Sequence, residues 1–200
     1  MNFRQFAYRN VVRNFRIYAA FFMASFFSVF VFFIYSMLVF HPEMEQGYLD
    51  GFSMFAMVLA EVILVLFSWF FIFYSMRAFL HARGKEFAVL VQLGMERRQV
   101  SKLIFLETMI IGIASSFVGI LFGYAFSSFF FMIIREILRL PALPLYLSWE
   151  PFVLTLSVFL SAFIVISYIS VILMPDANIM KNLKSSLLKE TNYQYSKKKA

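Results

Sequence analysis

The side chains that most often carry catalysis are few in this sequence, and they are not grouped. The 200 residues contain no cysteine and two histidines, His41 and His81, which fall in different connecting segments. The phosphate-binding motif Gly-x-x-x-x-Gly-Lys-Ser/Thr and the serine-hydrolase motif Gly-x-Ser-x-Gly are both absent. No apolar stretch holds the paired aspartates or the Ser/His pair that intramembrane proteolysis needs. We therefore predict no catalytic, cofactor-binding or metal-binding residue, and no enzyme.

Two carboxylates stand out because each lies inside a long apolar stretch. An ionisable group at membrane depth is expensive and by default marks a function. Glu61 could be protonated, face a cavity or pair with a second subunit, or it could simply contact a Ser or Tyr of a neighbouring helix. Glu107 lies about one turn inside a later stretch, where we expect an anchor at the membrane interface that reaches Lys102 or Arg77.

The polar segment 77–102 has a pattern that suits docking. A short helix is predicted over 85–93 because apolar side chains recur at i, i+3, i+4 spacing, at Phe87, Leu90 and Val91. Gly94 is a natural helix stop, since glycine tolerates the left-handed conformation. A second helix is expected to restart near Glu96. The apolar face of the short helix could dock a partner, or it could lie back on the membrane or on its neighbours.

The composition places these residues in lipid. Hydrophobic residues make up 62% of the chain and charged residues 14%, against about 45–50% and 25% in soluble domains. Such a chain cannot cover its surface with polar groups, and disordered, collagenous and disulfide-rich classes are excluded as well. The net charge of +7 then indicates membrane topology rather than nucleic-acid binding.

Four apolar stretches are long enough to cross a bilayer, which takes about 20 residues of helix. The predicted fold class is therefore an all-α integral membrane protein, a bundle of four transmembrane helices over 17–40, 52–76, 103–134 and 149–174. Small residues at i+4 spacing in the third span predict close helix packing or a sliding interface, at Ser115, Gly119, Gly123 and Ser127. The phenylalanine runs are expected to face lipid, at 26–27, 32–33, 70–71 and 129–131.

Basic residues are distributed unevenly between the connecting segments. Sixteen of the 18 Lys and Arg residues lie in 1–16, 77–102 and 175–200, and the other two are Arg135 and Arg139. The positive-inside rule then predicts cytoplasmic termini and a cytoplasmic 77–102 loop. The N-terminal segment is expected to be a basic amphipathic helix in the headgroup layer, or a plain basic flank, and 175–200 a basic cytoplasmic tail.

Residues 85–107 resemble the FtsX-like permease family, the membrane subunits of MacB-type ABC transporters. The resemblance lies in Glu86-Phe87, Leu90, Leu93-Gly94, Arg97-Arg98, Val100 and Glu107. In that family this segment is the coupling helix that contacts the ATPase subunit. The resemblance therefore implies ATPase-coupling residues at Glu86, Phe87, Leu90, Leu93, Gly94, Met95, Arg97 and Arg98. It also implies a structural or transmission role for Glu107.

The short connection 41–51 limits which members of the family the chain can resemble. Most members carry a large extracytoplasmic domain between the first and second spans, and this connection is too short for one. The chain is most similar to the N-terminal four-span half of bacitracin-export (BceB-type) permeases, which add six spans and a large external domain. We expect residues 1–200 to form one permease domain, as a split half, a truncated relict or a stand-alone subunit.

This resemblance implies a function in the bacterial cell membrane. A permease subunit or half-subunit would couple ATP hydrolysis by a separate ATPase to transport or removal of a cell-envelope-targeting antimicrobial peptide. The implied partners are that ATPase, a second permease half or copy, the lipid bilayer and a sensor histidine kinase, with no nucleic acid. A non-transporting regulatory subunit or relict is the alternative, and a proton-linked carrier that uses Glu61 is the third hypothesis.

Overall fold

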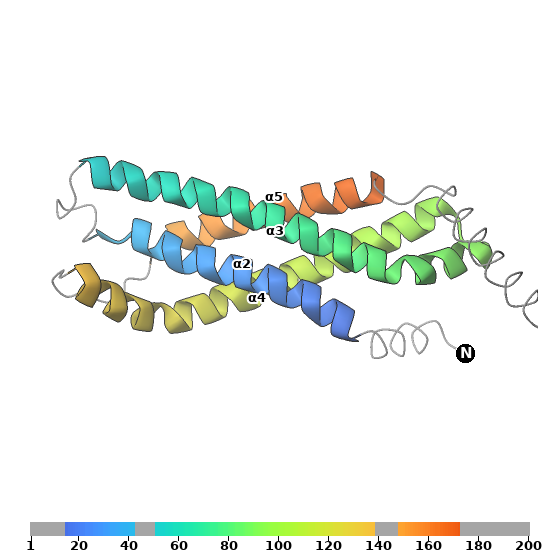
Figure 1. The fold of residues 1–200 in the computed structure, drawn as a ribbon, viewed down its shortest axis with the longest axis horizontal. Helices are drawn as coiled ribbons and strands as arrows, with labels where there is room; N and C mark the ends of the chain where they lie inside the picture. The colour runs from blue at the N-terminus through green and yellow to red at the C-terminus, as the bar shows by residue number, and fades with distance from the viewer. Residues whose placement is uncertain (1–14, 43–50, 139–147, 173–200) are drawn as a thin grey trace, which may run out of the picture.

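The computed structural model describes residues 15–42, 51–138 and 148–172. These residues form four long α-helices that lie side by side in one elongated bundle (Figure 1), with no strand among them: α2 (Phe15–Val39), α3 (Gly51–Gln92), α4 (Arg97–Leu138) and α5 (Glu150–Ile172). The all-helical fold class is confirmed for this part of the chain. The helix expected over 1–16, apart from its last two residues, and the tail 175–200 lie outside the described residues.

Each of the four helices contains a stretch long and apolar enough to cross a membrane. These stretches are Phe15–Val39, Gly51–Gly84, Arg98–Ile137 and Glu150–Ser170. The helices satisfy their backbone groups internally, which is the condition that lipid imposes on a spanning segment. The side on which the termini lie stays a prediction from the distribution of Lys and Arg.

Two helices are much longer than the spans predicted for them. α3 and α4 have 42 residues each, or about 63 Å at 1.5 Å per residue, roughly twice the thickness of the bilayer's hydrocarbon core. They continue together past the start of α2 and the end of α5 as a helical hairpin (Figure 1). The polar segment expected to be a loop with a separate short helix is therefore the projecting end of this hairpin.

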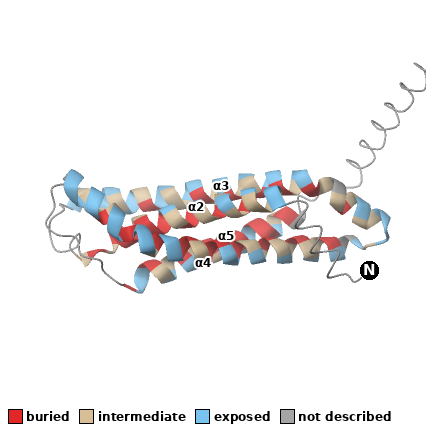
Figure 2. Ribbon diagram, turned by 90° about the horizontal axis from the view of Figure 1, so that it is seen from below, coloured by how far each residue is buried: buried red, intermediate tan, exposed pale blue. Residues whose placement is uncertain are grey.

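α2 occupies the middle of the bundle and packs against α4, α3 and α5. Buried residues line the inward faces of the helices, whereas exposed residues follow their outer faces (Figure 2). The outer faces carry large apolar side chains such as Phe55, Phe67 and Phe117. In water such surfaces would drive aggregation, but in a bilayer they are the natural contact with acyl chains.

The small residues of α4 bring its backbone close to α2. A Cβ atom added at Gly119 would lie 2.9 Å from Val29 Cβ and 3.2 Å from the carbonyl oxygen of Phe26. At Gly123 it would lie 2.6 Å from the Phe33 ring. Ser115 and Ser127 of the same stripe are fully buried. The stripe therefore faces α2, and the two helices could not approach this closely with larger residues at these positions.

The expectation that the phenylalanine runs face lipid is wrong for three of their members. Phe32, Phe33 and Phe131 are at most 1% exposed, whereas Phe27, Phe70 and Phe129 lie on the surface. Phe32 packs on Phe159 with ring centroids 5.5 Å apart, and Phe33 packs on Phe152 at 4.9 Å. For Phe32 and Phe33 the reason is the central place of α2: successive helical residues point about 100° apart, and α2 is covered on more than one side. Phe131 of α4 is covered by His41, whose ring centroid lies 5.5 Å from its own.

Candidate functional site at the helical hairpin

A glycine turn closes the projecting hairpin. α3 ends at Gln92, and Gly94 adopts a φ of +95°. The amide of Met95 donates to the carbonyl of Leu90 at 3.1 Å, and the amide of Gly94 donates to the carbonyl of Val91 at 3.1 Å. This pair of bonds is a Schellman motif, which requires a left-handed residue at the position of Gly94. The predicted helix stop at Gly94 is confirmed.

The second arm of the hairpin starts with a cap of its own. α4 begins at Arg97, and the side chain of Gln99 accepts a hydrogen bond from the amide of Glu96 at 3.2 Å. The amide of Gln99 in turn donates to the carbonyl of Glu96 at 2.9 Å. A Gln three residues after the cap position commonly makes this bond back to the cap amide. The turn is therefore fixed on both sides.

The predicted short helix over 85–93 is not a separate element. α3 runs unbroken through Gly84 to Gln92, because a helix tolerates an interior glycine at a cost of about 1 kcal/mol relative to alanine. The predicted apolar face is also displaced. Phe87 is 6% exposed and belongs to the core, whereas Val89 and Leu93 are 52% and 77% exposed.

The surface of this hairpin end, residues 86–98, combines an apolar centre with charged and polar neighbours. Leu93, Gly94, Glu96 and Arg98 are exposed, and Glu86, Leu90 and Met95 are half-buried. Leu90 and Met95 pack against the bundle core. The residues singled out from the sequence thus fall into two groups. Three lie at the surface: Leu93, Glu96 and Arg98. Three support the turn from the core side: Phe87, Leu90 and Met95.

A buried arginine joins the hairpin to the rest of the bundle. Arg83 is 2% exposed. Its Nε donates to Glu86 Oε2 at 3.1 Å, and its Nη1 donates to Glu107 Oε2. Tyr18 donates its hydroxyl to the other oxygen of Glu107 at 3.3 Å. These four side chains connect α2, α3 and α4. The prediction that Glu107 reaches Lys102 or Arg77 is therefore wrong, because its carboxylate pairs with Arg83.

Aromatic rings enclose the same guanidinium. The Arg83 Cζ atom lies 4.8 Å from the ring centroid of Tyr18, 5.4 Å from that of Phe79 and 4.9 Å from that of Phe87. Rings present their negative faces to a cation at such distances, and arginine stacks on them well because its guanidinium is planar and weakly hydrated. Hereafter the Arg83 cluster means Arg83, Glu86, Glu107 and these three rings.

Sequence reasoning missed Arg83, which was counted only as one of many basic residues near the membrane surface. A local signal for it did exist. Phe79 and Phe87 lie four residues on either side of Arg83, and Glu86 lies three residues after it. In a helix these positions share one face. The signal could be used only with the knowledge that the helix continues through this segment.

The Arg83 cluster has the features of a structural link between helices and not those of a catalytic site. Within the described residues no group of three His, Cys, Asp or Glu side chains could hold a metal ion. The guanidinium already donates to two carboxylates, so it is not a vacant anion site. The arrangement can hold the hairpin end in a fixed position relative to α2, through Tyr18, and to the part of α4 that carries Glu107.

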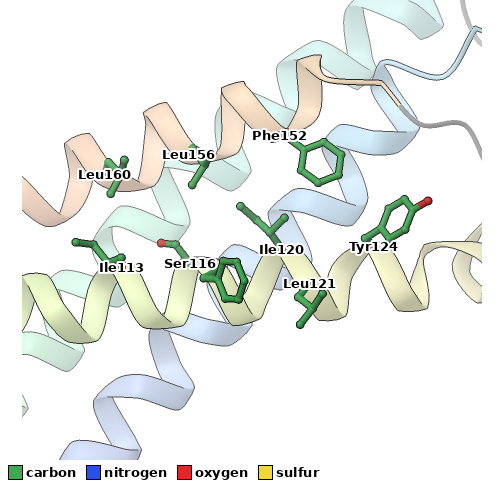
Figure 3. Close-up of a pocket in the computed structure, with 9 residues that line it drawn as sticks. Ile113, Ser116, Ile120, Leu121, Tyr124, Phe152, Leu156 and Leu160 are labelled. Carbon is green, nitrogen blue, oxygen red and sulfur yellow. The ribbon is translucent and has the colours of Figure 1, made fainter.

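A concave feature of the described residues lies elsewhere in the bundle. A groove of about 520 Å³ opens between α4 and α5. Its side chains come from both helices (Figure 3) and are apolar apart from the hydroxyls of Ser116 and Tyr124. Glu61 is also remote from the hairpin end, because about 46 Å of α3 separates it from Gln92 at 1.5 Å per residue. Neither feature adds a functional group to the hairpin site.

Known proteins are similar in sequence to this chain. Residues 58–178 match the family described as FtsX-like permease C-terminal. The ABC transporter permease protein YxdM of Bacillus subtilis (strain 168) is 41% identical over 186 residues, which cover 93% of this chain and 30% of that protein. The uncharacterized ABC transporter permease YvcS of the same organism is 34% identical over 201 residues, covering 98% of this chain and 31% of that protein.

A further relative carries a name that specifies a transported compound. The bacitracin export permease protein BceB of Bacillus subtilis (strain 168) is 26% identical over 185 residues, covering 92% of this chain and 29% of that protein. The chain thus spans about 30% of the length of the relatives it matches.

Proposed function

The chain belongs to the FtsX-like permease family, and from that premise we propose that it is a permease subunit, or half-subunit, of an ABC transporter in a bacterial cell membrane. Its relatives are membrane transport components rather than enzymes, and its four apolar helices make it a multi-pass membrane protein. The energy for transport would come from ATP hydrolysis in a separate ATPase chain.

The observation that carries this proposal is the hairpin formed by α3 and α4. Both helices extend well beyond the length that a bilayer requires, and the turn between them is capped on both sides. Its tip exposes Leu93 beside Glu96 and Arg98. A protein surface with an apolar anchor surrounded by charges is typical of a docking site. The positive-inside rule supports a cytoplasmic location for it, which is where an ATPase would lie.

Within this proposal the residues of the hairpin end have different tasks. Leu93 and Arg98 would touch the ATPase, with Glu86 at the edge of the contact. Gly94 would hold the turn, while Leu90 and Met95 would support it from the core side. The Arg83 cluster, which includes Phe87 and Glu107, would transmit movement of the tip to α2 and α4. Arg97, the first residue of α4, would complete the docking surface.

The substrate class is proposed by analogy with the bacitracin export permeases. Those relatives are 26% and 28% identical to this chain, and fold-level likeness alone does not fix a substrate. By this analogy we propose that the chain takes part in the transport or removal of a cell-envelope-targeting antimicrobial peptide. The proposed membrane partner is a second permease half or copy, and a sensor histidine kinase is proposed as a further partner.

The proposal is tested by affinity purification of the tagged chain from mildly solubilised native membranes, read by mass spectrometry. We expect a P-loop ATPase and a second FtsX-like membrane chain. Leu93→Asp should abolish recovery of the ATPase, because a charge would be forced against an apolar contact. His81→Asp is the matched control, since it introduces an aspartate at an exposed position of α3, away from the hairpin tip.

Each outcome of this purification separates one part of the proposal from another. If the ATPase is recovered equally well with Leu93→Asp, the hairpin end is not the docking surface. If the unmodified chain recovers no ATPase, the permease assignment is wrong, and a non-transporting regulatory subunit takes its place.

A further inference from the structure

A carboxyl group is buried between α3 and α2 in the half of the bundle opposite the hairpin tip. Glu61 lies ten residues into α3 and is 9% exposed. Its Oε1 atom has no hydrogen-bond partner among the described residues. Ser36 of α2 lies beside this carboxyl, is fully buried, and its hydroxyl is also without a partner in the described part of the chain.

The surroundings of Glu61 hold the two helices together without supplying a counter-charge. Tyr35 donates its hydroxyl to the carbonyl of Met57 at 3.0 Å, one helical turn before Glu61, and is its titratable neighbour on α2. Both ion pairs found among the described residues belong to Arg83. Glu61 is therefore enclosed by a tyrosine, a serine and apolar helix faces.

An ionised carboxylate in this position would be buried without a cation, which is strongly unfavourable in an apolar interior. A bound proton removes the charge. It also turns one carboxyl oxygen into a donor, and the neighbouring serine hydroxyl is an acceptor. We propose that Glu61 and Ser36 form a proton-binding site between α2 and α3, in which the carboxyl group is held as the neutral acid at pH 7.

This site is independent of the proposed transport function, because it depends only on the contact between α2 and α3. In the packed bundle the proton is enclosed. If α2 and α3 separate, water reaches the carboxyl group and solvates its charged form, so the proton is released. The proton on Glu61 thus reports whether these two helices are in contact.

Infrared difference spectroscopy of the chain in lipid bilayers at pH 7 tests the proposal. Subtracting the Glu61→Gln spectrum from the wild-type spectrum should leave the carbonyl stretch of a protonated carboxylic acid. Ser36→Ala should shift that band to higher frequency, because the acid proton of Glu61 loses its hydrogen bond to the serine hydroxyl. Carboxylate bands in place of the acid band, such as pairing with a cation from another chain would give, overturn the proposal.

A second measurement needs no substitution and so does not depend on how the variants fold. A lipid-soluble carbodiimide reacts with protonated carboxyl groups in apolar surroundings. Applied to the wild-type chain in membranes, it should add to the peptide that contains Glu61 and not to the one that contains Glu107, whose carboxylate is paired with Arg83. Adducts on Glu107 alone contradict the assignment.

Discussion

Arg83 shows how a charge can serve as a packing element in a membrane bundle. Its guanidinium is almost fully enclosed, yet two carboxylates and three aromatic rings surround it. A buried ion pair adds little net stability over an apolar cluster of the same shape, but removal of one partner leaves an uncompensated charge. The cluster therefore fixes which surfaces of α2, α3 and α4 meet.

Removing the guanidinium should destabilise the bundle. Arg83→Ala leaves Glu107 without its cation, and we expect a loss of about 3–5 kcal/mol in the free energy of unfolding. Arg83→Lys should recover only part of this loss, because an ammonium cannot contact two carboxylates and stack on rings at once. Denaturant unfolding of the purified chain in mixed micelles measures both.

The control for this prediction is an arginine of the same helix. Arg77 is exposed, so Arg77→Ala should change the unfolding free energy by less than about 1 kcal/mol. Equal effects of Arg77→Ala and Arg83→Ala would show that the Arg83 cluster does not hold the helices together.

At the scale of elements, the contact between α2 and α4 depends on glycine at one point. Gly119 faces both the Cβ of Val29 and a backbone carbonyl oxygen of α2. Neither atom can move away by a side-chain rotation. Close backbone approach at small residues is the main source of helix association in lipid, where apolar side chains gain nothing from leaving the solvent.

The same substitution should therefore have opposite effects at two glycines. Gly119→Ala forces the helices apart, and overpacking of this kind costs about 1–3 kcal/mol. A Cβ at Gly84 meets nothing within 4 Å, so Gly84→Ala should stabilise α3 by up to about 1 kcal/mol through helix propensity. Melting temperatures of the two variants in one detergent give the comparison. A melting temperature that Gly119→Ala leaves unchanged would argue against the close packing of α2 and α4.

The turn between α3 and α4 makes a further prediction. Gly94 has open space around it but a positive φ, so Gly94→Ala strains the backbone by about 1–2 kcal/mol. Gly94→Asn should cost less, because asparagine tolerates this conformation better than other residues with a side chain. Protease sensitivity of the hairpin end should increase in the order wild type, Asn, Ala. Equal sensitivity of all three would mean that the turn does not depend on glycine.

The sequence predicted these elements unequally well. Length and apolarity identified the four spans. The glycine at position 94, directly after the helical pattern, identified the end of the helix that precedes it. The sequence did not reveal that α3 continues through 77–92, because hydropathy reports where lipid begins and not where a helix ends. It also missed the Arg83 cluster and the burial of Phe32, because both depend on which helix occupies the centre of the bundle.

At the scale of the whole molecule, the bundle has two chemically different ends. One end carries the hairpin with Arg83, Glu96 and Arg98, and the other carries the start of α5, where the Ser148 hydroxyl accepts a hydrogen bond from the amide of Glu150 at 3.4 Å. Between them the outer surface is apolar, which is the arrangement that a bilayer requires.

Cysteine labelling checks which end faces the cytoplasm. The chain has no native cysteine, so Glu96→Cys and Trp149→Cys each place one thiol at an exposed position at opposite ends of the bundle. A membrane-impermeant maleimide should label the Trp149→Cys variant in intact cells, and the Glu96→Cys variant only after lysis. The reverse pattern would invert the topology and exclude an ATPase at the hairpin end.

The length of α4 has a mechanical consequence. Gly119, where α4 packs against the backbone of α2, divides the helix into arms of about 33 Å and 28 Å at 1.5 Å per residue. If the helix pivots there as a stiff rod, a tilt of about 5° displaces its two ends by about 3 Å in opposite directions. The α2–α4 crossing would then act as a fulcrum, and a small displacement at the hairpin would appear, reversed, on the far side of the membrane.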